Sequence, residues 1–266
     1  MDPLIVLSKY LSGIYSSSGY SAFFFVFFRV SAFVAVAPFF GSKNAPNKIK
    51  GLYALMLTAY ITPLVDVSNE LVNFEMSATV VSALLQQIVI GFIIGLVFHG
   101  LFDVLRMAGQ NISNATQLAF AQMVEPGSGL QSSVMGNVMH TLGQMYFLAS
   151  FGLAFVIGVF FKSFYAMPIS AEFMSGHSFF EVSLWMTHIF SFGLMLSIPS
   201  MGVGLLINAA MAIVTRSAPS LNIFSIGFPL VIISGVIALI QITPYMLHLF
   251  LVTSEQFLSI INKIGL

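Results

Sequence analysis

The side chains best suited to binding a metal ion or transferring a proton are five scattered histidines. They are His99, His140, His177, His188 and His248. No two of them stand at a metal-ligand spacing with a carboxylate between them, as a zinc-binding helix requires. His99 and Asp103 are four residues apart and could pair at the end of a helix. We interpret all five histidines as ordinary interface residues rather than as metal ligands.

The sequence lacks the residue patterns that are typical of catalytic nucleophiles and of nucleotide-binding sites. The chain has no cysteine, which excludes disulfides, thiolate nucleophiles and thiolate metal sites. No G-x-S-x-G elbow, embedded Ser–His or Asp–Asp constellation, or glycine-rich phosphate loop is present. The net charge is zero, so nothing favours nucleic acid as a partner. The sequence therefore predicts a protein that is not an enzyme and that uses no cofactor and no metal.

The overall composition indicates a membrane protein. Apolar residues make up 58% of the 266 residues and charged residues 7%, whereas a soluble domain carries roughly 25% charge. So few charged side chains cannot cover a soluble surface, and lipid or partner subunits must cover it instead. Residues 1–19 lack a basic start and a small-residue cleavage site, so we expect no cleavable signal peptide there.

Six apolar runs are candidates for crossing a bilayer as helices. They cover residues 20–40, 51–65, 77–102, 134–161, 184–214 and 223–252. The second is marginal, because a helical crossing needs about 20 apolar residues. Hydrocarbon leaves backbone groups no outside partner, and these runs exceed the roughly 10 residues of a barrel strand. We predict an all-α integral membrane protein, with about six long hydrophobic helices in one polytopic domain over residues 1–266.

The basic residues predict the orientation of these helices. Placing the turn at residues 43–50, which holds three lysines, in the cytoplasm puts five basic residues inside and three outside. This bias predicts that both termini lie on the periplasmic side.

Several residues break the apolar pattern of the first and third runs. Arg29 lies near the middle of the first run, where a charge costs at least ~2.5 kcal/mol on insertion scales. We favour an assembly contact over ion conduction, because one arginine makes no pathway. Gln86 and Gln87 are neighbours on a helix, so at least one should face protein. Gly91 and Gly95 have the small-xxx-small spacing that lets helices approach closely.

A small and polar stripe follows one face of the run at residues 184–214. Its members recur every four residues, at Ser200, Gly204, Asn208, Ala212 and Arg216. Such a face is suited to tight packing on another helix, because lipid offers its polar groups no partner. Pro199 comes just before the stripe, and we predict that it kinks the helix.

Residues 103–133 form a long polar stretch with no charge between Arg106 and Glu125. A lipid-facing span could not tolerate its many amides, and a solvated loop would normally carry charge. Neutral polar backbone at membrane depth is tolerated where it lines or blocks a water-filled cavity. The stretch is therefore either a plug in a channel or a long surface loop with turns at residues 126–129, and its residues leave both readings open.

The sequence resembles the FliR family, whose injectisome members are called SctT. The most specific match is the segment NAAMAIVTRSAPSLNIFSIGFPLVIISG at residues 208–235. Its family positions are Asn208, Arg216, Ala218, Pro219, Leu221, Asn222, Phe224, Gly227, Phe228 and Pro229. Further matches are Arg29 and Pro38, the short segment that ends at Pro63, Gly109, and the turn with Glu125, Pro126 and Gly129. The resemblance spans nearly the whole chain.

This resemblance implies a core membrane subunit of the flagellar type III protein-export gate. Such a subunit forms the export pore for unfolded flagellar proteins with FliP and FliQ, and contacts FlhB and FlhA. It lies in the bacterial inner (cytoplasmic) membrane, within the flagellar basal body, as tilted helical hairpins. A polar re-entrant, plug-like loop at residues 103–133 closes the resting pore.

The residue patterns and the resemblance together predict two groups of site residues. The pore plug comprises Met107, Gly109, Gln110, Asn111, Asn114, Gln117, Phe120, Gln122 and Met123. Assembly or structural contacts involve Arg29, Pro38, Pro63, Gly91, Gly95, Pro126, Gly129, Asn208, Arg216, Pro219, Asn222, Gly227 and Pro229.

Three other functions were compared with this one. The nearest is the equivalent SctT subunit of a virulence injectisome. A secondary transporter for a small solute would need paired intramembrane charges or helix breaks in matching halves. Pro63 and Pro199 are such breaks, but the two halves of the chain are not similar. A membrane-embedded enzyme lacks any nucleophile or metal constellation.

Overall fold

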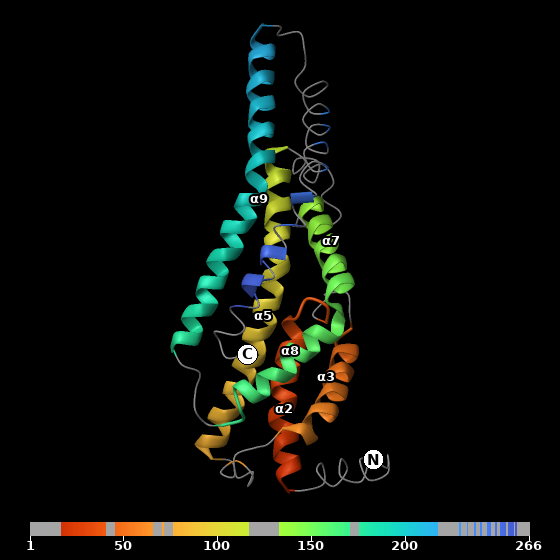
Figure 1. Ribbon diagram of the computed structural model, residues 1–266, viewed down its shortest axis with the longest axis vertical. Coiled ribbons are helices and arrows are strands. Elements are labelled where there is room, and N and C mark those ends of the chain that lie inside the picture. Colours follow the sequence, from red (N-terminus) through yellow and green to blue (C-terminus); the bar gives the residue numbers. More distant parts are fainter. Residues whose placement is uncertain are drawn as a thin grey trace. The chain divides into compact units, whose positions relative to one another are not determined.

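The computed structural model describes residues 17–40, 46–65, 71, 77–116, 133–170 and 176–217, and isolated positions between 229 and 259. These residues are helical apart from short turns and one bridge position, which confirms the all-α prediction. The helices are α2 (Ser17–Val36), α3 (Asn47–Ile61), the 3₁₀ helix η1 (Thr62–Leu64), α5 (Ala78–Ala115), α7 (Val134–Ser150), α8 (Gly152–Ala166) and α9 (Gly176–Ser217) (Figure 1).

Three of the described helices are long and apolar enough to cross a membrane. These segments are Gly19–Val36, Ala78–Ala115 and Phe179–Val214, and the broken pair of α7 and α8 is a possible fourth. With 15 residues, α3 falls short of the roughly 20 that a crossing needs. The chain is thus a helical membrane protein, while the prediction of about six spans stays a prediction.

The chain packs into two compact units. The first comprises residues 1–99, 151–184 and 259–266, and the second comprises residues 100–150 and 185–258. The first contains α2, α3, α8 and the N-terminal part of α5. The second contains the C-terminal part of α5, α7 and most of α9. The prediction of one membrane domain over the whole chain stays a prediction.

Phenylalanine rings fill the first unit. Phe33 of α2 stacks on Phe160 of α8, with ring centres 4.3 Å apart and planes 21° apart. Phe33 also meets Phe98 of α5 edge-on, with ring centres 6.3 Å apart. All three rings are buried. Because lipid tails are as apolar as these rings, close van der Waals packing rather than escape from water holds the helices together.

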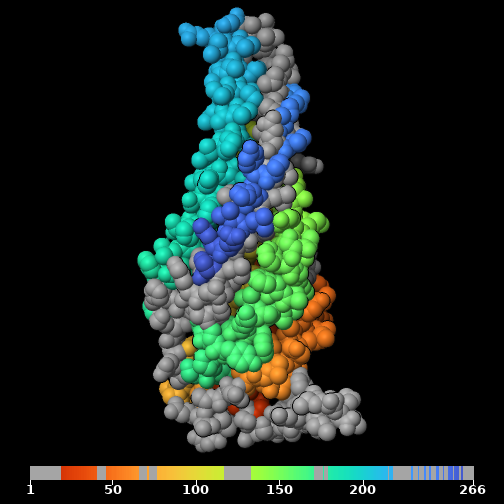
Figure 2. All heavy atoms as spheres, in the orientation of Figure 1, coloured from red at the N-terminus to blue at the C-terminus, as the bar shows by residue number. Residues whose placement is uncertain are grey.

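One face of α3 is buried within the first unit, and the other face is exposed. Ala54, Thr58 and Ile61 are buried at intervals of four and three residues, as one side of a helix requires. The hydroxyl of Thr58 donates to the Ala54 carbonyl at 2.6 Å, so this buried hydroxyl has a hydrogen-bond acceptor within its own helix. The α3 segment is drawn in orange in Figure 2. Its exposed large apolar side chains are Leu52, Tyr53, Leu55, Met56 and Tyr60. Lipid or a partner chain must cover such a face.

The predicted loop at residues 103–133 begins too early. Residues 103–115 continue α5 without a break, and α7 starts at Val134 directly after that stretch. The prediction was wrong there because polar side chains were taken as the end of a span. Instead, amides such as Asn111 find partners on packed neighbouring helices, so the helix continues through them. Residues 117–132 lie outside the described residues.

The apolar run at residues 134–161 is not one continuous span. Helix α7 ends at Ser150 and α8 begins at Gly152, whose φ of 72° lies in the left-handed region. Glycine adopts that region at little cost, whereas a side chain would clash there. Figure 1 also shows α9 changing direction near the middle of its length, and Pro199 lies inside that helix.

Candidate functional site

Arg29 of α2 lies fully buried in the first unit and is bound from three sides. Its Nε donates to Oε1 of Gln87 on α5 at 2.7 Å. Its Nη1 donates to the carbonyl oxygen of Ser163 at 3.0 Å, and its Nη2 to the carbonyl oxygen of Met167 at 2.8 Å. The guanidinium carbon lies 4.3 Å from the centre of the Phe164 ring. Among the described residues, all these partners are neutral.

The end of α8 explains how Arg29 is accommodated without a carboxylate. Ser163 lies in the last turn of α8 and Met167 directly follows that helix. Carbonyl groups in the last turn of a helix lack intrahelical partners and form the negative end of the helix dipole. Arg29 therefore serves as a charged C-terminal cap of α8 while its Nε holds α5. The cluster joins α2, α5 and α8.

Two glycines bring α5 into backbone contact with α2 beside this cluster. A Cβ added to Gly91 would overlap the carbonyl oxygen of Arg29 and would lie 3.0 Å from its carbon. One turn further on, a Cβ on Gly95 would lie 3.2 Å from the carbonyl oxygen of Phe33. Real Cβ atoms are not found as close as the first of these contacts, so only glycine fits there.

In the second unit, the C-terminal part of α5 meets α7 in an equally close contact. A Cβ on Gly109 would lie 2.7 Å from the Cα of Gly136 and 2.8 Å from the carbonyl oxygen of Met135. A Cβ on Gly136 would lie 2.9 Å from the carbonyl oxygen of Arg106. We call this line of contacts between α5 and α7, defined by Arg106, Gly109 and Gly136, the α5–α7 seam.

Gln110 and Ser133 close the seam at the start of α7. The Ser133 hydroxyl accepts a hydrogen bond from the backbone N–H of Gly136 at 3.0 Å, as an N-cap residue does. The backbone N–H of Ser133 in turn donates to Oε1 of Gln110 at 3.1 Å. In a capping box, the acceptor for the N–H of the N-cap residue is the side chain of the third residue of the same helix. Here that residue is a glycine, and Gln110 of α5 supplies the acceptor.

The other side of α5 packs on α9. Nδ2 of Asn111 donates to the hydroxyl of Ser197 at 3.2 Å. Nδ2 of Asn208 donates to the carbonyl oxygen of Ala115, the last residue of α5, at 3.4 Å. A Cβ on Gly204 would lie 2.8 Å from that same oxygen. The end of α5 thus contacts Gly204 and Asn208, which are members of the predicted stripe.

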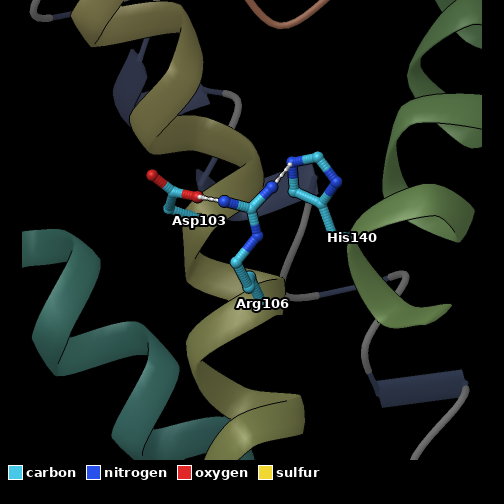
Figure 3. A network of polar contacts seen from close by, with 3 residues as sticks. All are labelled: Asp103, Arg106 and His140. Carbon is cyan, nitrogen blue, oxygen red and sulfur yellow. Dashed lines mark hydrogen bonds and ion pairs between the residues drawn. The ribbon is translucent and has the colours of Figure 1, made fainter. Parts of the chain in front are cut away.

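One polar network crosses the seam. Nη1 of Arg106 lies 3.2 Å from Oδ1 of Asp103, one turn earlier on α5. Nη2 of Arg106 lies 2.8 Å from Nε2 of His140 on α7 (Figure 3). The side chains of Asp103 and Arg106 are 33% and 37% exposed, so the network lies at the surface of the isolated chain. The ring of His140 also meets the Phe102 ring edge-on, with centres 6.1 Å apart.

The predicted plug residues divide into two groups. The structure places five on α5, namely Met107, Gly109, Gln110, Asn111 and Asn114. The first four contact α7 or α9, whereas Asn114 is exposed and accepts a bond from Gln110 at 3.4 Å. The other four lie outside the described residues: Gln117, Phe120, Gln122 and Met123.

The predicted assembly residues are also only partly brought together. Arg29, Gly91 and Gly95 meet in the first unit. Pro38 is buried in the turn after α2, and Pro63 lies in η1. Asn208 meets the end of α5, whereas Arg216 and Pro229 are exposed on helical backbone. The remaining ones lie outside the described residues: Pro126, Gly129, Pro219, Asn222 and Gly227.

Some important residues were not singled out from the sequence. Gly136 and Gly143 stand seven residues apart in one apolar run, and that spacing could have predicted a helix-packing face. The carbonyl groups of Ser163 and Met167 leave no trace in a sequence, because every residue carries one. The Arg106–His140 contact joins residues 34 apart and has no local signal.

Comparisons with known proteins place this geometry in a wider context. A family described as bacterial export proteins, family 1, matches residues 20–257. The flagellar biosynthetic protein FliR of Escherichia coli (strain K12) is 31% identical over 248 residues, covering 92% of this chain and 94% of that protein. FliR of Pectobacterium carotovorum subsp. carotovorum is 31% identical over 249 residues, with the same two shares. FliR of Aquifex aeolicus (strain VF5) is 31% identical over 222 residues, covering 82% and 83%.

Proposed function

Because this chain belongs to the bacterial export proteins of family 1, together with its FliR relatives, we propose that it is a core membrane subunit of the flagellar type III protein-export gate. This proposal rests on how much of this chain, and of its relatives, the sequence matches cover. The family matches residues 20–257, and the Escherichia coli relative aligns over 94% of its own length. A relative matched end to end shares its whole architecture with this chain, not one module of it.

In this proposal the chain forms the export pore with FliP and FliQ, contacts FlhB and FlhA, and passes unfolded flagellar proteins. It lies in the bacterial inner membrane at the flagellar basal body. The exposed apolar side chains of α3 support a partner-covered role, because a 15-residue helix is too short to cross a bilayer on its own.

We further propose that residues 109–123 block the resting pore. Support comes from the described part of that segment. Gln110 and Asn111 are neutral amides on a membrane-crossing helix, and each is bonded to a neighbouring helix or its cap. Neutral polar groups of this kind are tolerated at membrane depth where protein or a water-filled cavity surrounds them. Export opens the pore as a population shift driven by the entering chain and by partner movement.

Deletion of the gene tests the export role, with motility and flagellin secretion as the readouts. Loss of both, restored by the intact chain, is the expected result. Retention of filaments and secretion would overturn the flagellar proposal and leave an injectisome subunit or a transporter. Purification in mild detergent separates these further, because a gate subunit brings FliP and FliQ, whereas a transporter comes alone or as a homo-oligomer.

A shorter deletion tests the plug. Residues 117–122 contribute nothing to α5, to the Asn208 contact or to the Ser133 cap, so a deletion of these six residues spares all three. We expect membranes that contain the assembled variant to leak small solutes. Unchanged leakage in a complex that still contains all its subunits would contradict the plug while leaving the export role intact.

A further inference from the structure

We propose that the α7–α8 corner, defined as residues 148–154, is in contact with water rather than with lipid, so that the membrane crossing made by this apolar run ends at Ser150. This inference goes beyond the export role and does not depend on it, since it concerns the surroundings that one break in a helix requires. It rests on the backbone hydrogen-bonding groups at the two helix ends.

The break interrupts the hydrogen-bond ladder of a helix. Helix α7 ends at Ser150, and α8 begins at Gly152 with a φ of 72°. The last carbonyl groups of one helix and the first N–H groups of the next have no partner within their own helix. Among the described residues, no side chain caps the start of α8. The described backbone hydrogen bonds outside the helices also include none to Gly152, Leu153 or Ala154.

The residues on both sides of the break are exposed in the folded chain. Leu148, Ala149 and Ser150 are exposed at the end of α7. Leu153 and Ala154 are exposed at the start of α8. A Cβ added to the glycine between them would meet nothing within 4 Å. The partners of these backbone groups must therefore come from the surroundings of the chain.

Hydrocarbon cannot supply those partners. An unsatisfied backbone group is costly in lipid, and irregular backbone at membrane depth is therefore found only where protein or water surrounds it. Water donates and accepts hydrogen bonds without a fixed geometry, so it serves carbonyl and N–H groups alike. A partner protein would need matched groups for both helix ends. The side chains at the corner, apart from the Ser150 hydroxyl, offer such a partner no polar contact.

The length of α7 agrees with a crossing that ends at the corner. Its 17 residues extend over about 25 Å at 1.5 Å per residue, and about 17–25 residues suffice to cross a bilayer. The large exposed side chains before the corner are apolar and suit hydrocarbon or an apolar partner: Val134, Val138, Leu142 and Met145. Helix α8 then starts anew at the aqueous boundary instead of continuing the crossing.

Thiol labelling of the full-length chain in its native membranes tests this, because the chain has no natural cysteine. A maleimide reacts with the thiolate, which forms where water or another polar group stabilises its charge. Ser150→Cys and Ala154→Cys place a thiol at the corner, and Leu142→Cys places one at an exposed position two turns earlier. In opened membranes, a charged maleimide should label the corner thiols at least about tenfold faster than Leu142→Cys. All three should react alike after denaturation.

The size of the reagent distinguishes two sources of water. If the corner lies at the membrane surface, a maleimide on a large polyethylene glycol should label it as well as the small reagent does. If the water fills a cavity inside an assembly, only the small reagent should reach the thiols. Either result supports contact with water, whereas corner thiols that react as slowly as Leu142→Cys would overturn the proposal.

A lysine at the same positions gives a measurement that does not depend on reagent access. Ser150→Lys should accumulate in the membrane at the level of the parent chain, because water accommodates the charge. Leu142→Lys puts that charge in the middle of α7 and should accumulate at least about tenfold less. An equal loss of both variants would contradict an aqueous corner.

Discussion

Nε of Arg29 donates to Oε1 of Gln87 at 2.7 Å, so a charge in the first apolar run is bound to an amide in the third. The bond satisfies the amide oxygen of Gln87, whereas its Nε2 is buried with no hydrogen-bond partner among the described residues. The guanidinium gains a buried acceptor, and the amide gains a partner that lipid cannot offer. Among the described residues, the contacts of Arg29 lie within the first unit and are those of a structural arginine.

Replacing Arg29 with lysine should destabilise the protein although the charge is kept. An ammonium group has no planar fork and cannot serve Gln87 and both α8 carbonyl groups together. Each lost hydrogen bond to a charged group costs about 1.5–3 kcal/mol. Thermal unfolding of the purified chain should show a lower midpoint for Arg29→Lys. Arg216→Lys, at an exposed arginine, should stay within about 0.5 kcal/mol of the parent.

A methyl group at Gly91 should separate α5 from α2. Its Cβ would overlap the carbonyl oxygen of Arg29, which is backbone and cannot swing aside. Overpacking of this kind costs about 1–3 kcal/mol. Gly158→Ala on α8 is the matched control, because a Cβ there meets nothing within 4 Å. That control should be neutral or stabilising by about 0.5–1 kcal/mol. Equal unfolding midpoints for the two variants would contradict the close approach.

The same comparison can be made across the α5–α7 seam. In Gly109→Ala the new Cβ would lie 2.7 Å from the Cα of Gly136, so the helices must move apart. Gly202→Ala on α9 adds the same group where a Cβ meets nothing within 4 Å. We expect Gly109→Ala to lower the unfolding midpoint and to raise small-solute leakage through the assembled complex. A rise in leakage of the same size in Gly202→Ala would show that the seam is not its cause.

The cap of α7 should behave as one unit shared by two helices. Ser133→Ala should cost about 1 kcal/mol, as loss of an N-cap does. Gln110→Ala should cost about 0.5–1.5 kcal/mol for the bond to the Ser133 N–H. A double-mutant cycle should give a coupling of about 0.5 kcal/mol or more. Ser133→Thr keeps the cap and should unfold like the parent, and strictly additive costs would disprove the sharing.

Much of the helical structure could be predicted from local pattern. The first apolar run became α2, ending at Val36 just before the turn that contains Pro38, because a proline disfavours helix in the residue before it. The spacing of Gly91 and Gly95 predicted a close helix contact, and both lie against α2. The predicted start of the polar loop at residue 103 was wrong, because residue type alone does not reveal whether an amide will find a partner. Asn111 finds one in Ser197, 86 residues away.

The break between α7 and α8 is a second feature that local sequence pattern could not predict. The run at residues 134–161 is apolar throughout, and a hydropathy argument cannot distinguish one span from two helices joined at Gly152. Glycine permits the φ of 72° found there but does not require it. Gly158, in the same run, stays helical with open space around it. The apolar pattern of the run therefore does not say which glycine becomes the break.

The sequence by itself determined that this is a helical membrane protein of the export family. Those properties follow from composition, from the length of apolar runs and from a long string of matched residues, all of which are local or additive. Only the tertiary structure decided that Arg29 caps α8, that Gln110 completes the cap of α7, and that Arg106 reaches His140. These contacts join residues far apart in the chain, and their partners include backbone groups that every residue carries. A hydrogen bond depends on distance and direction in space. The residue types along the chain can therefore show that a polar group needs a partner, but not which group that partner is.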